Sequence, residues 1–392
     1  MMDHKPNTIA VAGHVCLDVI PQFDQNRALG DAPIFEPGSL LKVGPALQST
    51  GGVVSNTGLA LHKLGIPVTL MGKIGDDLFG HEIIKQFKDV APHLADNMIV
   101  SKDQPTSYSV VIDPPGVDRM FLHCPGANDT FSPDDLDTDA LKDIALFHFG
   151  YPPIMKTMYE NHGNNLASLM QRVKQTNTIT SLDMCSVDPE SEAGKISWEA
   201  LLANVLPHVD LFLPSYDEIA FMLGYEVPKN DKDICTKQLN EIASKLISLG
   251  SSVIILKLGK QGLYLRTTDN AQAIEKLNLD PSWVGREVYS PCHYVKPVGA
   301  TGAGDCTIAG FLAAVTIGQD PQKAASTATA VGAFSVLSMD ATGGIQHLDI
   351  VNERLGTEWP RHDLEMNFSN WHHTPEGELL GPNDITAKSL KQ

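Results

Sequence analysis

The segment Val298–Asp305 reads VGATGAGD and continues directly into the apolar run Cys306–Ala314. This pattern predicts a glycine-rich turn that opens a helix, with the Asp305 carboxylate at the point of entry. Unpaired N–H groups at a helix start form an anion site, and glycine lets the backbone approach the anion closely. A carboxylate there would repel a phosphate, so Asp305 is better explained as a proton acceptor. An anion hole beside a base indicates transfer of a phosphoryl group to a hydroxyl.

Two other phosphate-binding motifs do not fit this chain. A P-loop ends in Gly-Lys-Ser/Thr, and no lysine follows the turn at Gly304. A dinucleotide fingerprint follows an early strand, but the early apolar run Ile9–Gly13 is not followed by one, which disfavours a dehydrogenase. Glycine-rich turns before helices are common, so this segment alone leaves a plain structural turn as an equal alternative.

A second glycine cluster lies at Gly51–Asn56. Taken alone, the pair Gly51 and Gly52 is most simply a turn. Asn56 is then most simply the N-cap of a helix over Thr57–Leu64.

The composition limits the classes of partner. The chain has 392 residues, of which 42% are hydrophobic, and a net charge of −18. Such an acidic chain argues against nucleic acid and anionic membranes as partners. A single anion such as ATP is still compatible, because a local anion hole and a metal ion outweigh the global charge. The six cysteines are scattered, no signal peptide precedes them, and no apolar run could span a bilayer, so we expect a cytoplasmic protein with reduced thiols.

Strand-like and helix-like runs alternate through most of the chain, which predicts a mostly parallel sheet with helices on both faces. The predicted strands are Ile9–Val15, Val68–Ile74, Ser107–Ile112, Ala145–Phe149, Thr178–Asp183, Leu211–Leu213 and Val253–Leu258. The predicted helices are Asn56–Leu64, His81–Phe87, Asn164–Lys174, Glu218–Leu223 and Leu239–Leu249.

Two stretches fit this alternation poorly. Pro21–Gln48 is rich in Pro and Gly, and Ser107–His123 alternates around a Pro-Pro-Gly turn. They predict either a small accessory β-sheet over the active site or long surface loops. An exposed apolar face on such a sheet could join two subunits into a homodimer. The residues after Val351 lose periodicity, and their aromatic residues favour an extension that lies over the core.

Taken together, the two glycine clusters resemble the paired signatures of the ribokinase-like family, the PfkB carbohydrate kinases. Gly51, Gly52, Asn56, Gly65 and Gly75 match the N-terminal signature, and residues 302–305 match the core of the C-terminal one. Lesser matches fall in order between them, at 126–128, 149–150, 218, 259 and 262. The resemblance implies an α/β fold of three layers, α/β/α, with a small β-sheet lid. We expect a kinase domain at 8–350, lid segments near 16–50 and 105–125, and a C-terminal extension at 351–392.

The resemblance also implies residue roles. Asp305 corresponds to the catalytic base, and the amides of Gly302, Ala303 and Gly304 correspond to the anion hole. Glu218 matches the acid that organises Mg²⁺ through water. The positions that match acceptor-binding residues are Asp18, Gly51, Gly52 and Asn56. Those that match nucleotide-binding residues are Ser215, Lys257, Gly259, Gly262 and Thr301, with 328–344 as the adenine-side wall.

Three departures from the family pattern bear on specificity. Gly299 and Ala300 replace a pair whose carboxylate often helps bind an activating K⁺. Ser215 stands where the family usually has Asn, which alters the metal arrangement. No Arg follows Asp183 closely, which argues against an anionic sugar.

The sequence therefore predicts ATP-dependent phosphorylation of a primary hydroxyl on a sugar or sugar-like polyol, with Mg²⁺. One alternative is a nucleoside kinase, for which Phe35, Leu40 or Phe121 would form a slot for the base. Another is a sugar-binding regulatory protein without catalysis, although the retained Asp305 argues against it.

Overall fold

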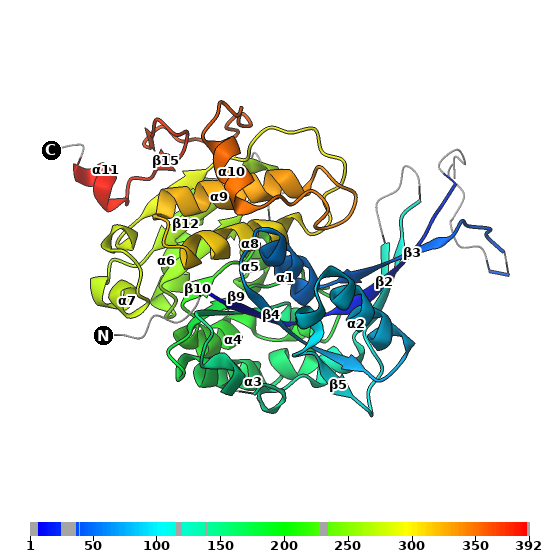
Figure 1. Ribbon diagram of the computed structural model, residues 1–392. Helices are drawn as coiled ribbons and strands as arrows, with labels where there is room; N and C mark the ends of the chain where they lie inside the picture. The colour runs from blue at the N-terminus through cyan, green and yellow to red at the C-terminus, as the bar shows by residue number, and fades with distance from the viewer. Residues whose placement is uncertain are drawn as a thin grey trace.

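The computed structural model describes residues 7–24, 37–38, 40–114, 120–137, 139–227 and 234–389. Within these residues, one large sheet of 11 strands forms the centre of the molecule (Figure 1). From edge to edge its strands are β14 (His372–His373), β15 (Leu379–Leu380), β13 (Glu287–Ser290), β12 (Leu263–Thr267), β11 (Val253–Lys257), β10 (Leu211–Phe212), β9 (Ile179–Leu182), β8 (Leu146–Gly150), β1 (Ile9–Gly13), β4 (Val68–Gly75) and β5 (Ile99–Ser101).

The strands from β11 to β5 run parallel to one another, as their continuous apolar sequences predict. The other strands, β12 to β15, pair in antiparallel fashion and extend the sheet beyond β11. All the predicted strands of this sheet are present, with ends shifted by at most two residues.

Helices cover both faces of the sheet, giving three layers. They are α1 (Val53–Lys63), α2 (Leu78–Val90), α3 (Lys156–Lys174), α4 (Trp198–Val205), α5 (Tyr216–Met222), α6 (Thr236–Ser248), α7 (Ala271–Lys276), α8 (Ala303–Thr316), α9 (Pro321–Ser335), α10 (Leu348–Leu355) and α11 (Ile385–Ser389).

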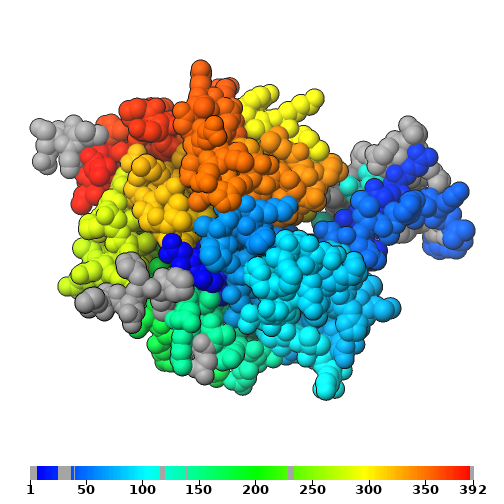
Figure 2. All heavy atoms as spheres, in the orientation of Figure 1, coloured from blue at the N-terminus to red at the C-terminus, as the bar shows by residue number. Residues whose placement is uncertain are grey.

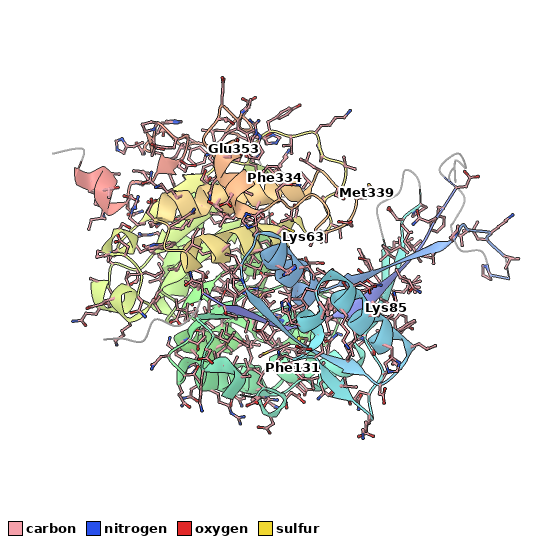
Figure 3. The ribbon with its side chains drawn as sticks, in the orientation of Figure 1. Lys63, Lys85, Phe131, Phe334, Met339 and Glu353 are labelled. Carbon is pink, nitrogen blue, oxygen red and sulfur yellow. The ribbon has the colours of Figure 1, made fainter. Side chains whose placement is uncertain are left out.

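Each face of the sheet has its own buried apolar cluster, because side chains alternate along a strand. Ile9 and Val11 of β1 point to the cluster shared with α1, α8 and α9, whereas Ala10 and Ala12 point to the one shared with α3, α4 and α6. Figure 3 accordingly shows Phe334 on the α9 side and Phe131 on the α3 side. The sequence-based fold, a three-layer α/β arrangement, is confirmed.

A second, smaller sheet stands out from this body (Figure 2). Its four strands lie in the order β3 (Ala46–Gly51), β2 (Cys16–Pro21), β6 (Tyr108–Ile112) and β7 (Met120–Cys124). The predicted accessory β-sheet is therefore present: Ser107–His123 supplies most of β6 and β7, whereas Pro21–Gln48 reaches the sheet only at its two ends, and its described residues between them form no strand. Phe35 lies outside the described residues.

The chain after α10 packs onto the α/β body. Phe368 and Trp371 are buried in the cluster on the α3 side, and β15 pairs with β13. The Asp384 carboxylate accepts a hydrogen bond from Arg286 Nε at 2.8 Å, and both side chains are almost fully buried. A paired, buried charge of this kind ties the C-terminal segment to the sheet. Within the described residues, no helix has the length and apolar character that crossing a membrane requires.

Candidate functional site

Several polar side chains meet at the carboxyl edge of the parallel sheet. His14 follows β1, Tyr151 follows β8, Asp183 follows β9, and Lys257 ends β11. The carboxyl ends of parallel strands share one edge, which is where open α/β sheets usually bind ligands. The N-terminal end of α8 enters at the same edge and brings Asp305 with it.

The predicted turn and helix at 298–314 are present. Gly302 has a left-handed backbone, with φ of 68°, and caps α8. A Cβ on Gly302 would lie 2.6 Å from the Ala341 Cβ, so the turn accepts only glycine without a shift. The Ala303 N–H donates to the Ala300 carbonyl at 3.3 Å, so an anion would have to replace this bond to use that amide.

The Asp305 carboxylate is buried and hydrogen-bonded on both oxygens. Asn56 Nδ2 donates to Oδ2 at 2.8 Å. The Tyr151 hydroxyl lies 2.9 Å from Oδ1 and 2.8 Å from Oδ2. Burial raises the pKa of Asp305, while the bonds from Asn56 and Tyr151 and the charge of Lys257 oppose the rise. These contacts fix the orientation of the carboxylate at the helix start.

Asn56 does not have the capping role that its local sequence predicts. Helix α1 begins at Val53, and its N-cap is Gly52, with φ of 84°. Asn56 therefore lies within the first turn of α1, where its side chain faces Asp305 instead of the helix end. The N-cap interpretation is wrong because the glycine pair already starts the helix four residues earlier.

The next group of predicted residues lies where β2 and β3 pair: Asp18 is on β2, Gly51 ends β3, and Gly52 follows it. A Cβ on Gly51 would be 2.5 Å from the Asp18 Oδ2, so the missing side chain makes room for this carboxylate. The Cys16 thiol donates to Asp18 Oδ1 at 3.4 Å. Burial raises the pKa of Asp18, and the contacts with Cys16 and Ser109 oppose the rise. A carboxylate in this position accepts hydrogen bonds from hydroxyl groups.

His14 adds a ring to the same region. It is 2% exposed, and its ring lies 6.0 Å from that of Tyr151 in a stacked arrangement and 5.2 Å from that of His123. Neither ring nitrogen has a hydrogen-bond partner among the described residues. Burial and the nearby His123 lower the pKa of His14 to about 3, so the ring is neutral near pH 7.

The Lys257 side chain extends to the turn that starts α8. Its Nζ lies 2.7 Å from Asp183 Oδ1, and the Asp183 side chain is only 1% exposed. A Cβ on Gly304 would be 3.9 Å from Lys257 Cε, so the ammonium group lies next to the helix start. Burial raises the pKa of Asp183, against the effect of Lys257. Burial would lower the pKa of Lys257, but the charges of Asp183, Glu218 and Asp305 together raise it.

Ser215 and Glu218 form a capping box at the start of α5. The Ser215 N–H donates to Glu218 Oε2 at 2.7 Å, and Ser215 pairs with Lys257 as an isolated parallel bridge. Glu218 therefore belongs to the same region as Lys257. Among the described residues, no three His, Cys, Asp or Glu side chains lie close enough together to hold a metal ion.

The remaining predicted nucleotide positions lie at two turns. Gly259, with φ of 56°, starts the turn between β11 and β12, and Gly262, with φ of 116°, ends it against the Ser290 carbonyl. Thr301 precedes Gly302 in the α8 turn. Gly259 follows Lys257 by two residues, so this turn continues from the strand end that faces α8.

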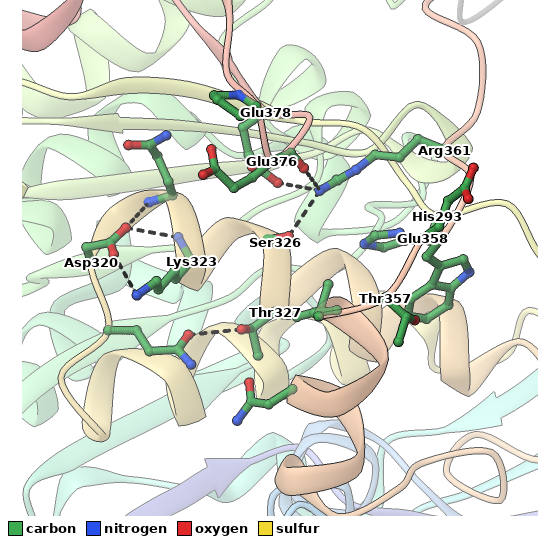
Figure 4. Close-up of a pocket in the computed structure, with 17 residues that line it drawn as sticks. His293, Asp320, Lys323, Ser326, Thr327, Thr357, Glu358, Arg361, Glu376 and Glu378 are labelled. Carbon is green, nitrogen blue, oxygen red and sulfur yellow. Dashed lines mark hydrogen bonds and ion pairs between the residues drawn. The ribbon is translucent and has the colours of Figure 1, made fainter.

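A pocket of about 650 Å³ lies elsewhere, between α9, α10 and the C-terminal segment (Figure 4). Its charges pair mainly with one another: Arg361 contacts Glu378 and Ser326, and Asp320 caps α9. The residues discussed above do not line it.

Sequence analysis missed His14 and Tyr151 as site residues. His14 lies near the carboxyl end of the predicted strand Ile9–Val15, and Tyr151 lies two residues after the predicted strand Ala145–Phe149; these positions at strand ends are a usable signal. Tyr151 also has a left-handed backbone, with φ of 67°, which the following prolines do not reveal. The contact of Tyr151 with Asp305 spans 154 positions, and no local pattern indicates it.

Comparison with known proteins supports the resemblance found in the sequence. The family model described as pfkB family carbohydrate kinase matches residues 7–348. An uncharacterized sugar kinase of Archaeoglobus fulgidus is 24% identical over 290 residues, 73% of this chain and 98% of its own length. A deoxyribokinase of Salmonella typhimurium is 25% identical over 360 residues, 88% of this chain and 98% of its own.

Solved structures share the fold. An Arabidopsis thaliana ribokinase complexed with ribose and ATP has a TM-score of 0.70 at 18% identity, covering 90% of this chain and 99% of its own. A ribokinase II from E. coli, in complex with ATP and Mg²⁺, has a TM-score of 0.65 at 19% identity, covering 89% and 99%. With a family match over nearly the whole length and an α/β body of the same architecture, the chain belongs to the pfkB family of carbohydrate kinases.

Proposed function

We propose that this protein transfers the γ-phosphoryl group of ATP to a primary hydroxyl of a sugar or sugar-like polyol. Asp305 would take the proton from the acceptor hydroxyl, and the amides of residues 302–304 would stabilise the charge of the migrating group. The observation that carries this proposal is the position of the Asp305 carboxylate, held by Asn56 at the glycine-rich start of α8.

The residues around Asp305 suggest where the acceptor and the nucleotide would bind. Asn56 connects the base to the start of α1, where Gly51 and Gly52 adjoin Asp18, and these residues would hold the other hydroxyls of the acceptor. Lys257 lies next to Gly304, where its charge would suit the phosphates of ATP.

The nucleotide site would extend from Lys257 to the neighbouring turns. Ser215 and Thr301, with the turn from Gly259 to Gly262, would contact ATP. Glu218 would hold Mg²⁺ through water, which suits an ion that keeps much of its hydration shell. The ion would supply positive charge to the phosphates. The carboxylate suits this role because its charge acts on Lys257, and Ser215, which donates to it, pairs with Lys257.

The activity is tested by ADP-coupled turnover with Mg-ATP against a panel of neutral sugars, polyols and nucleosides. We expect turnover with a neutral sugar or polyol, and Asp305→Asn should lower kcat by ~10²–10⁴ while ATP binding and thermal stability persist. Asp349→Asn, which changes an exposed carboxylate on α10, is the matched control. Normal turnover by Asp305→Asn would show that this carboxylate is not the base.

The same panel decides between the acceptor classes. Leu40 and Phe121 are 97% and 59% exposed and do not form a closed slot for a nucleobase in this structure. A preference for nucleosides over sugars would replace the sugar assignment. Binding of a sugar, seen as a rise in the melting temperature, without ADP formation would indicate a regulatory protein instead.

We expect turnover without added K⁺. A side chain at Gly299 would come within 2.7 Å of the Ser338 carbonyl, so this turn leaves no room for the carboxylate that the family often uses there. Assays with K⁺ and with a large organic cation in its place test this. A rise of tenfold or more with K⁺ would contradict it.

We also propose that two copies associate through the small sheet. Its edge strands are β3 and β7, and Leu47, Phe121 and Leu122 on them are each more than half exposed. Exposed apolar patches of this kind mark interaction surfaces. Light scattering should give the mass of a dimer, and Phe121→Glu should give a monomer. A monomeric wild-type protein at micromolar concentration would contradict the proposal.

A further inference from the structure

Tyr151 has an unusual place in the chain. It follows Gly150, the last residue of β8, and precedes Pro152. Its backbone is left-handed, with φ of 67° and ψ of 35°, a conformation that non-glycine residues seldom adopt. Sparsely populated backbone conformations cluster at functional sites, where the surrounding structure holds them in place. In this case the conformation carries the phenol ring towards Asp305.

The Tyr151 hydroxyl makes an almost symmetric contact with the base. Its oxygen is 2.9 Å from one carboxylate oxygen of Asp305 and 2.8 Å from the other. Burial, followed by the charge of Asp305, raises the pKa of Tyr151 well above its usual value, so the phenol keeps its proton and donates it. The ring is further held by stacking on His14.

This contact competes with the reaction that Asp305 is proposed to promote. A general base must accept a hydrogen bond from the reacting hydroxyl, at about 2.6–3.2 Å. The Tyr151 hydroxyl already stands at that distance from both oxygens, and Asn56 also donates to Oδ2. An incoming alcohol or a water molecule must compete with the phenol for these oxygens, because the hydrogen bond from Tyr151 makes Asp305 a weaker base until the phenol is displaced.

An alcohol and a water molecule differ in their ability to do so. A sugar has further hydroxyls that can bind near Asp18 and Asn56, and that binding energy can offset the lost phenol contact. Water has no such additional contacts. Kinases must exclude water from the activated phosphoryl group, since hydrolysis competes with transfer.

We propose that Tyr151 is a specificity-determining residue of this enzyme: its hydroxyl occupies the base until an anchored acceptor displaces it, which suppresses hydrolysis of ATP by water. The inference rests on the proposed function, because it takes Asp305 to be the base. It adds a residue that selects an alcohol over water at the reacting position.

The test is Tyr151→Phe, which removes the hydroxyl and keeps the ring that stacks on His14. We expect ATP hydrolysis without acceptor to rise about tenfold, and the KM for the acceptor to fall about tenfold, since hydrogen bonds to charged groups typically change equilibria by at least that factor. Rates of both proteins are compared at the same pH. Tyr159→Phe, on the buried face of α3, is the control and should leave both quantities unchanged.

Two results would overturn the inference. One is a fall in kcat at unchanged acceptor KM, which would make Tyr151 a positioning residue needed in the transition state. The other is equal ATP hydrolysis by wild type and Tyr151→Phe, including none by either. The hydrolysis assay needs no acceptor, so its outcome is separate from failure of the acceptor panel or of Asp305→Asn, which would refute the proposed kinase chemistry instead.

Discussion

Replacing Lys257 by methionine should destabilise the fold in a pH-dependent way. Lys257 and Asp183 are 2.7 Å apart, with side chains only 11% and 1% exposed. Removing one member of a buried ion pair leaves the other charge uncompensated and costs about 3–5 kcal/mol of unfolding free energy. That full cost applies only where Asp183 is ionised.

The pH dependence follows from the pKa of Asp183. Burial raises this pKa, and Lys257 is the largest influence that lowers it, so the variant raises it further. A carboxyl group whose pKa is higher in the folded than in the unfolded state supports folding at low pH, and that support is lost as the pH rises through the folded-state pKa. We therefore expect a loss of about 1 kcal/mol at pH 5, from the hydrogen bond alone, and a larger loss at pH 8.5, which approaches about 3–5 kcal/mol only at a pH where Asp183 of the variant is ionised.

Urea unfolding of wild type, Lys257→Met, Asp183→Asn and the double variant at pH 5 and pH 8.5 would measure these values. In the double variant neither position 183 nor position 257 carries a charge, so the pH dependence that this pair contributes should be absent, and the stability should lie above that of Lys257→Met at pH 8.5. An equal loss for Lys257→Met at both pH values would refute the reasoning, since the cost would then not come from an ionised Asp183.

Three further predictions test other parts of the structure. Gly302→Ala should lower kcat by ~10²-fold, because its Cβ would lie 2.6 Å from that of Ala341 and shift the anion-binding turn; steady-state kinetics near the wild-type values would contradict this. Asp384→Ala leaves Arg286 buried without its carboxylate and should cost about 3–5 kcal/mol in urea unfolding, so a loss under 1 kcal/mol would show that the contact matters little. The kcat/KM should fall as the pH drops through the raised pKa of Asp305, which lies above the ordinary value of about 4; full activity at pH 4.5 would contradict a raised pKa for the base.

The sequence predicts those parts of the fold that repeat a regular pattern. The parallel strands read as continuous apolar runs because both faces are buried, and the helices between them show one apolar side. β12 escaped prediction because the polar Arg266 interrupts its apolar run, and β13 because it is short and begins with the polar Glu287, although both side chains are buried. β14 and β15 have only two residues each, too few for any period.

The candidate site also has parts that the sequence predicts and parts that it does not. Gly302 and Asp305 could be found because a glycine turn and a helix start are local patterns with a chemical meaning. The contacts of Asp305 with Asn56 and Tyr151 span 249 and 154 positions and arise only when the sheet is assembled. Asn56 in particular has a plausible local role as a cap, which the tertiary structure overrides.

The short strands near the C-terminus have a consequence for solubility. β15 pairs with the outer side of β13, whose backbone N–H and C=O groups would otherwise form an unpaired edge of the sheet. Unpaired sheet edges can pair with strands of other molecules, whereas a two-residue strand is too short to form such a pairing. A chain truncated after residue 348, where the family match ends, would lack β15 and should aggregate through β13 during expression. Every proposed catalytic residue would still be present.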